Sequence, residues 1–170
     1  EMDGVKIATL QSIHFISKVQ DCTANIFRIG STESGAILLD SIELLSNHAP
    51  RAIENLKIIN LEKAVSQCID AASEEFDPQW QKKLLSAASF GKDSLPYKLF
   101  DPRKFVETCD LLRVLNVLKS LGIFVTATQF KKLTLNGIIN RLLKANNFYD
   151  CFQICQFLNS QEKIPTITAT

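Results

Sequence analysis

The stretch LLRVLNVLKSLG, residues 111–122, has seven aliphatic residues among its first eleven positions. Its long polar residues, Arg113, Asn116 and Lys119, follow one another at intervals of three, so on a helix they occupy roughly 120° of the circumference. The remaining arc of about 240° is apolar, far wider than the stripe of about 100° that a surface helix buries. We therefore expect a helix that is covered on at least two sides.

The same polar spacing recurs near the end of the chain. In FYDCFQICQFL, residues 148–158, Asp150, Gln153 and Gln156 again follow one another at intervals of three. Two helices of this kind favour a stack in which each helix is covered by the helices before and after it. A partner protein that covers part of either apolar arc is the alternative.

Helix start signals recur through the rest of the chain. Two aspartates precede a proline at a first helical position, where the missing N–H of proline costs no hydrogen bond. Two asparagines stand before other helical patterns, and one Thr with a Gln three residues later has the spacing of a capping box. These signals are Asn60, Asp77-Pro78, Asp101-Pro102, Thr126 with Gln129, and Asn147.

From about residue 31 to 159 these patterns predict roughly six to eight helices of modest length, joined by short loops. We expect an all-α fold, an irregular α-solenoid of stacked helical hairpins over 21–160, because so many short elements cannot share one bundle axis. Ahead of it, GVKIATLQSIHFISKV (4–19) predicts two short strands separated by a polar break. Since two strands alone are marginal in water, we assign 1–20 to a sheet that continues elsewhere. Residues 161–170 are expected to form a flexible tail.

The charge is unevenly distributed, although the net charge is only +1. Residues 33–77 carry nine acids against three bases, whereas 111–149 carry six bases and no acid. The basic segment is either a solvated face or a surface for an acidic protein partner or another anionic surface. A nucleic-acid-binding module is the functional alternative, although aromatic and basic residues do not alternate there.

Catalytic and metal-binding patterns find little support. The two histidines, His14 and His48, have no nucleophile at a diagnostic spacing, and no phosphate-binding loop or zinc motif occurs. Cys151 and Cys155 share one helix face, but no nearby His or further Cys completes a metal site. The odd number of scattered cysteines, five in all, is typical of reduced core thiols. We expect a binding protein with no catalytic residues, no metal and no cofactor, and we see no signal peptide or membrane span.

Several strings are specific enough to indicate a family. LLSAASFGK (84–92), CDLLRVLNVLKSLGIFVTATQFKKLT (109–134) and INRLLKANNFYDCFQICQFL (139–158) resemble the family of subunit sixteen of the class C vacuolar protein sorting complex. IFRIGSTESGAILLDSIELL (26–45) is similar to the segment that follows the N-terminal β-propeller in that family. Members of the family usually continue through further helices, whereas this chain ends soon after QFLNSQEKIP and opens on Glu rather than Met, so we expect a piece of a longer protein.

The resemblance implies a scaffold rather than a catalyst. Family members are core subunits of the HOPS and CORVET complexes, which tether late endosomes, lysosomes or vacuoles to their fusion partners. Their C-terminal solenoid holds the Sec/Munc-type (SM) subunit, which in turn templates SNARE assembly. The two strands within 1–20 would then be the last strands of the propeller. Localisation would be cytoplasmic and peripheral on endosomal and vacuolar membranes, through the complex.

Carried onto this sequence, the SM-binding surface would lie within 102–158. The candidate residues are long polar or apolar groups around the two widest faces of the acid-free segment: Arg113, Asn116, Val117, Arg141 and Lys144. For Val117 core packing is the competing interpretation, and for Arg141 and Lys144 a solvated face. A helical domain of an enzyme complex, with no activity of its own, is a third interpretation of the chain.

Overall fold

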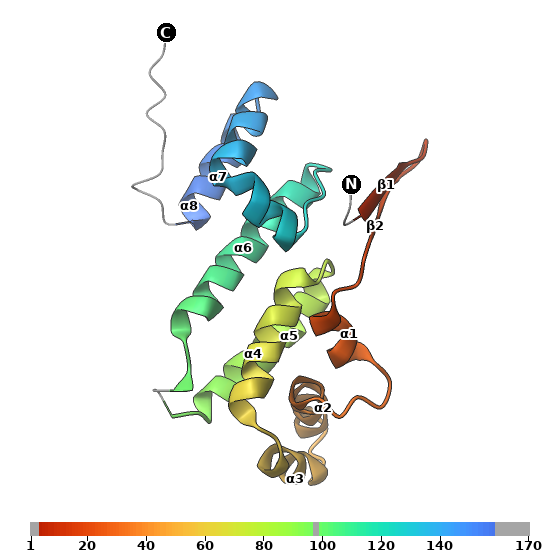
Figure 1. Cartoon of the computed structure of the whole chain (residues 1–170), viewed down its shortest axis with the longest axis vertical. Coiled ribbons are helices and arrows are strands. Elements are labelled where there is room, and N and C mark those ends of the chain that lie inside the picture. The colour runs from red at the N-terminus through yellow and green to blue at the C-terminus, as the bar shows by residue number, and fades with distance from the viewer. Residues whose placement is uncertain (1–3, 97–98, 159–170) are drawn as a thin grey trace. The chain divides into compact units, whose positions relative to one another are not determined.

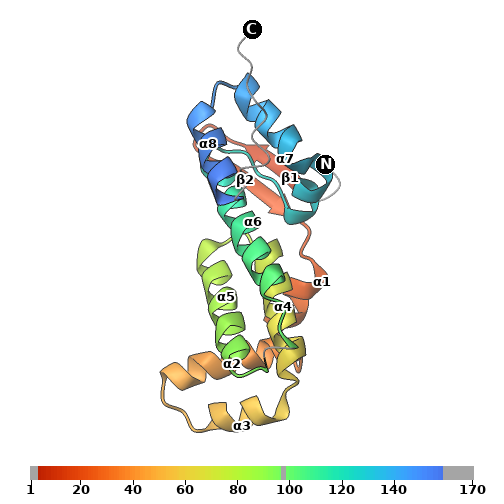
Figure 2. The same ribbon diagram turned by 90° about the vertical axis from the view of Figure 1, so that its left-hand side faces the viewer.

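The computed structural model describes residues 4–96 and 99–158, which form eight helices and one antiparallel pair of strands (Figures 1 and 2). The elements are β1 (Gly4–Ala8), β2 (Ile13–Ser17), α1 (Asp21–Phe27), α2 (Ser34–Ser46), α3 (Arg51–Ile58), α4 (Leu61–Glu74), α5 (Pro78–Asp93), α6 (Pro102–Ser120), α7 (Ala127–Lys144) and α8 (Phe148–Phe157). The mostly helical fold with a short N-terminal strand pair is confirmed. The expected tail, 161–170, lies outside the described residues.

The chain divides into two compact units. We call Val19–Thr108 the helical unit, and the residues up to Lys18 together with those from Cys109 onward the hairpin unit. Helix α6 contributes its first turns to the helical unit and its remaining turns to the hairpin unit. The assignment of 1–20 to a propeller stays a prediction.

The helical unit is built on a hairpin of α4 and α5, which run side by side in both views (Figures 1 and 2). Helix α2 packs against both α4 and α3, and α1 also contacts α4. Small side chains let these helices approach closely, and their facing sides are buried. The buried small residues are Ala64, Ala71 and Ala72 on α4, and Ala87, Ala88 and Gly91 on α5.

Four of the five predicted caps form, and they begin four of the eight helices in the described residues. Asn60 accepts from the Lys63 N–H at 3.0 Å, and Asp77 accepts from the Gln79 N–H at 2.9 Å. Asp101 does the same for the Arg103 N–H at 2.9 Å. The capping box of α7 is complete. The Thr126 hydroxyl accepts from the Gln129 N–H, and the Gln129 side chain accepts from the Thr126 N–H. Asn147 stands at the predicted start of α8, but its side chain makes no cap bond.

In the hairpin unit β1 and β2 pair in a register that sets Gly4 opposite Ser17 and Ala8 opposite Ile13. The hairpin contacts the loop between α6 and α7. The Phe15 ring stacks on the Phe124 ring at 5.5 Å between centroids, and Lys6 Nζ donates to the Gly122 carbonyl at 2.8 Å. These contacts tie the strand pair to the helices of its own unit.

The core of the hairpin unit joins α6, α7 and α8 through a cluster of buried aliphatic residues and one cysteine. Its members are Val114, Leu118, Ile138, Ile139, Leu142, Cys151 and Ile154. Helix α7 is broken at Thr134, whose φ of 61° and ψ of 159° are not helical. The apolar periodicity of 127–144 did not indicate this break. No helix in the described ranges 4–96 and 99–158 combines the length and apolar character needed to cross a bilayer.

Candidate partner-binding site

The last three turns of α6 are covered almost all round, as the composition of 111–122 predicts. Leu112, Val114 and Leu118 are buried. Between residues 111 and 121 only Arg113 and Ser120 are exposed, and the other side chains are buried or half-buried. The wide apolar arc of this helix is therefore used for packing.

Arg113 is exposed and forms an ion pair with Asp110, one turn earlier on α6, at 3.0 Å between Nη1 and Oδ1. Such exposed pairs contribute little to stability. The pair nevertheless places an acid beside the first base of the segment, just outside its acid-free range. Burial raises the pKa of the neighbouring Cys109 thiol, and the charge of Arg113 opposes that rise.

Asn116 and Val117 are half-buried. Val117 packs against the aliphatic core of the hairpin unit, and its carbonyl accepts from the Ser120 hydroxyl at 2.7 Å. Core packing thus accounts for the buried part of the Val117 side chain. Leu142, near the end of α7, lies in the same core, so Val117 and the end of α7 belong to one group of packed helices.

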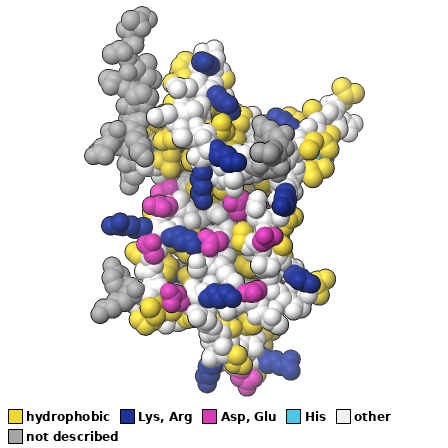
Figure 3. Space-filling view, in the orientation of Figure 1, with side chains coloured by type: hydrophobic (Ala, Val, Ile, Leu, Met, Phe, Trp, Pro, Cys, Tyr) yellow, Lys and Arg dark blue, Asp and Glu magenta, His cyan; other side chains and the backbone are white. Residues whose placement is uncertain are grey.

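Arg141 and Lys144 lie in the last turn of α7, and both are exposed. Their position suits the helix dipole, which favours cations at the C-terminal end of a helix. The space-filling view shows Lys and Arg side chains over α7 and no Asp or Glu side chain there (Figure 3). This turn therefore presents two exposed bases of the predicted surface together.

Helix α8 differs from the prediction, since its apolar arc is covered mainly on one side within the described residues. Cys151 and Ile154 are buried, whereas Phe148, Tyr149 and Phe152 are 60%, 70% and 58% exposed. The Gln153 amide donates to the Tyr149 hydroxyl at 3.0 Å. Three exposed aromatic side chains on one short helix mark a surface of the kind that protein partners cover.

Reactive groups are dispersed. His14 hydrogen-bonds through Nε2 to the Ser12 hydroxyl at 2.7 Å on the exposed hairpin. Burial raises the pKa of all five thiols, and it raises that of Cys68 to about 12. A thiol held protonated is a poor nucleophile and a poor metal ligand. Within 4–96 and 99–158 no three His, Cys, Asp or Glu side chains gather as a metal site would require.

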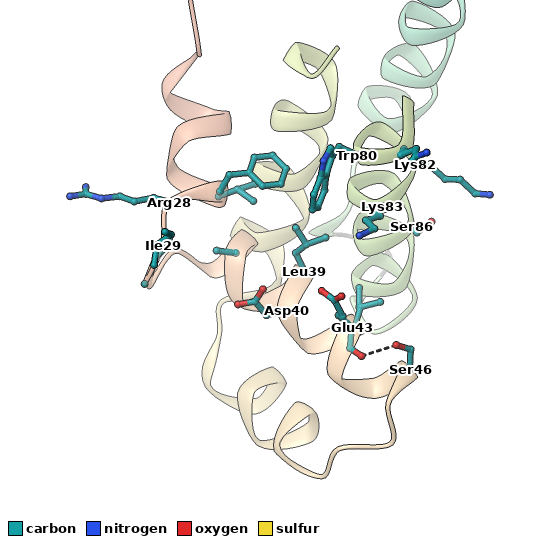
Figure 4. Close-up of a pocket in the computed structure, with 17 residues that line it drawn as sticks. Arg28, Ile29, Leu39, Asp40, Glu43, Ser46, Trp80, Lys82, Lys83 and Ser86 are labelled. Carbon is teal, nitrogen blue, oxygen red and sulfur yellow. Dashed lines mark hydrogen bonds between the residues drawn. The ribbon is translucent and has the colours of Figure 1, made fainter. Parts of the chain in front are cut away.

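A pocket of about 720 Å³ in the helical unit is the feature that the sequence did not indicate (Figure 4). The end of α1 with the loop that follows it, one side of α2, and the first turns of α5 line this pocket. These segments are far apart in the sequence, so no local motif brings them together. The sequence signals that could have pointed to a pocket are the single tryptophan, Trp80, and the acidic composition of 33–77.

The comparisons with known proteins agree on one family. The sequence model of the family described as "Vps16, N-terminal region" matches residues 1–107. Vacuolar protein sorting-associated protein 16 of Saccharomyces cerevisiae is 52% identical over 161 residues, which are 95% of this chain and 20% of the yeast protein. Protein VACUOLELESS1 of Arabidopsis thaliana is 38% identical over 168 residues, 96% of this chain and 19% of the plant protein.

A third relative, from Dictyostelium discoideum, has the same range. This vacuolar protein sorting-associated protein 16 homolog is 36% identical over 168 residues, 96% of this chain and 20% of its own length. The chain therefore spans about a fifth of the length of the curated relatives it matches.

Proposed function

Because the chain belongs to the Vps16 family, we propose that it is part of a scaffold subunit of a vacuolar protein sorting complex. The observation that carries the proposal is the identity of 52% to the yeast sorting protein over nearly the whole chain. The described structure supports a scaffold, because stacked helices with buried, protonated thiols supply packing surfaces rather than reactive groups. The complex is of the HOPS or CORVET type, which tethers endosomal and vacuolar membranes, and the chain acts by binding rather than by catalysis.

Within this role the hairpin-unit helices bind the SM subunit, which promotes SNARE assembly. The basic last turn of α7, Arg141 and Lys144, faces solvent and meets an acidic surface of the partner. Arg113, Asn116 and the exposed part of Val117 extend that contact along α6. Arg113 contributes least, since Asp110 already neutralises part of its charge. Membrane association is peripheral and follows from the complex.

The test is co-purification of the SM subunit with the full-length protein carrying Arg141→Gln and Lys144→Gln. Glutamine has a shorter side chain but a similar helix propensity, so the change removes the charge at little cost to the helix. The matched control is Arg51→Gln with Lys57→Gln, two exposed bases on α3 of the helical unit. We expect the α7 pair to weaken capture at least about tenfold and the α3 pair to leave it unchanged. Equal capture by the α7 variant refutes the basic contact.

The nucleic-acid alternative uses the same bases and is separated by salt. Phosphate-driven binding to a generic duplex or single strand falls steeply with ionic strength and is lost in the α7 variant. We expect no binding of either nucleic acid above about 0.15 M salt, where a specific protein contact persists. Binding there that depends on Arg141 and Lys144 favours the alternative.

A further inference from the structure

The pocket in the helical unit has one apolar wall built around an aromatic pair (Figure 4). Phe27, the last residue of α1, meets Trp80 of α5 edge to face, with 5.0 Å between ring centroids and 76° between planes. The two rings are 36% and 38% exposed, and Leu39 of α2 lines the pocket beside them. Lys83 Nζ lies 4.3 Å from the centroid of the Trp80 ring, which holds that ring in place.

The opposite part of the pocket is acidic. Asp40 and Glu43, one turn apart on α2, both line the pocket, and their carboxylates lie below Leu39 in the view of Figure 4. Among the described residues neither carboxylate takes part in an ion pair or a side-chain hydrogen bond. Desolvation in the pocket and the charge of Glu43 both raise the pKa of Asp40. Two like charges without a counter-ion are a site that a cation would stabilise.

The bases around the pocket do not supply that cation. Figure 4 shows the side chains of Arg28 and Lys82 extending away from the pocket on opposite sides. The Lys83 ammonium is engaged by the face of Trp80. The pocket therefore combines an apolar wall with a negative charge that nothing in the described structure pairs.

The apolar surface continues beyond the pocket. Ile29 is fully exposed at the rim, in the loop that Gly30 turns with a φ of 73°. The pocket volume of about 720 Å³ lies within the range of roughly 300–1,000 Å³ for ligand pockets. The exposed Ile29 side chain extends the apolar surface at its rim. The Trp80 indole N–H makes no hydrogen bond to a described residue, so it can donate to a carbonyl of a bound backbone. This surface fits a stretch of peptide better than a small apolar molecule.

We propose that the pocket binds a short segment of a partner protein that places an apolar side chain against Phe27, Leu39 and Trp80 and a flanking Arg or Lys beside Asp40 and Glu43. The apolar side chain is buried by the aromatic pair, which supplies most of the affinity. The basic side chain pairs with both carboxylates and selects the segment. This contact is independent of the SM surface, which lies in the other unit.

The test uses Trp80, the only tryptophan of the chain, as the reporter. The probes are two matched arrays of blocked heptapeptides, each with an apolar or aromatic residue at the third position. One array has Arg three or four residues later, and the other has Glu there. We expect members of the Arg array to change Trp80 emission with Kd values of about 10–100 μM, which is common for short peptides, and the Glu array to have no effect.

Variants then locate the contact. Asp40→Asn with Glu43→Gln should weaken the best Arg peptides at least about tenfold, because the charge-assisted hydrogen bonds are lost. The matched control, Glu54→Gln with Glu107→Gln, removes two exposed acids that do not line the pocket and should leave affinity unchanged. Both variants must retain the far-UV helical signal of the wild-type chain. If the double Asp40 and Glu43 variant loses that signal, Glu43→Gln alone is measured in its place.

Four results overturn the proposal. They are an array in which no peptide changes the emission, equal binding of the Arg and Glu arrays, unchanged affinity in the pocket variant, and an equal loss in the control. A shift of Trp80 emission by lauric acid but by no peptide would assign the pocket to a small apolar ligand. A shift that depends only on the concentration of the chain would assign it to a second copy.

Discussion

Gly91 on α5 lies directly against Val65 on α4, so that a Cβ atom at Gly91 would be 2.6 Å from Val65 Cγ2. The same atom would also be 3.2 Å from Leu38 Cδ2 on α2. Val65 and Leu38 are both buried, and the branched Val side chain has little freedom to rotate away. The absence of a side chain at Gly91 is therefore what allows α5, α4 and α2 to pack at this distance.

Gly91→Ala should destabilise the helical unit, although Ala favours a helix over Gly by about 1 kcal/mol. Overpacking costs about 1–3 kcal/mol, so we expect a net loss of about 1 kcal/mol in the free energy of unfolding. Urea denaturation followed by Trp80 emission measures this unit. Adding Val65→Ala should make the effect of Gly91→Ala smaller or reverse its sign, because it removes the clashing methyl group.

Gly137→Ala on α7 is the matched control. A Cβ atom there meets only Thr134 Oγ1, at 3.9 Å, so the helix propensity of Ala is gained without a clash. We expect a stabilisation of up to about 1 kcal/mol, measured by far-UV circular dichroism in urea. Substitutions at Gly91 and Gly137 that change stability in the same direction would contradict the packing argument.

The capping residues make a second contrast. Thr126→Ala removes the hydroxyl that accepts from the Gln129 N–H, while the backbone N–H of residue 126 can still donate to the Gln129 side chain, and it should lower the free energy of unfolding by about 1 kcal/mol. Asn147→Ala removes a side chain that makes no cap bond and should cost less than half as much. Urea denaturation of the two variants, followed by circular dichroism, compares them directly. An equal loss in both would show that cap geometry does not decide stability at these ends.

The residues that were predicted correctly share a physical property. Caps at Asn60, Asp77, Asp101 and Thr126 depend on hydrogen bonds to backbone groups two or three residues away. Local sequence contains everything that such bonds require.

The features that were missed depend on distant or competing interactions. Phe27, Leu39 and Trp80 form one wall only because three helices meet, and periodicity shows that a face is apolar without showing what covers it. For the same reason the spacing of the polar residues on α8 predicts the width of its apolar arc but not the exposure of Phe148 and Tyr149. A positive φ is unfavourable for a β-branched residue such as Thr134, so backbone preferences would not predict the break in α7 at this position.

The Cys68 thiol should make stability depend on pH in alkaline solution. Burial raises its pKa in the folded state from 9.0 to about 12, and in the unfolded chain it returns to the ordinary value. Its contribution to folding is therefore fully present below pH 9 and is lost as the pH rises towards 12. Between pH 8 and pH 10 the wild-type chain should lose about 1 kcal/mol more than Cys68→Ala. Urea denaturation at the two pH values measures the difference, and parallel losses would argue that the thiol does not titrate on unfolding.

The attachment of the hairpin should depend on Phe124, which stacks on Phe15 and lies 5.6 Å from the Lys6 ammonium. An isolated two-stranded hairpin is marginally stable in water, so its order depends on what it packs against. In Phe124→Ala the cross-strand amides, such as those of Val5 and Ile16, should exchange with solvent at least about tenfold faster, while those of α4 and α5 keep their rates. Hydrogen exchange followed by mass spectrometry resolves the two sets of peptides. Phe152→Ala is the control, because that ring is exposed on α8 and its loss should leave hairpin exchange unchanged. Unchanged exchange in Phe124→Ala would mean that the hydrogen bond from Lys6 to Gly122 holds the hairpin without the stacked rings.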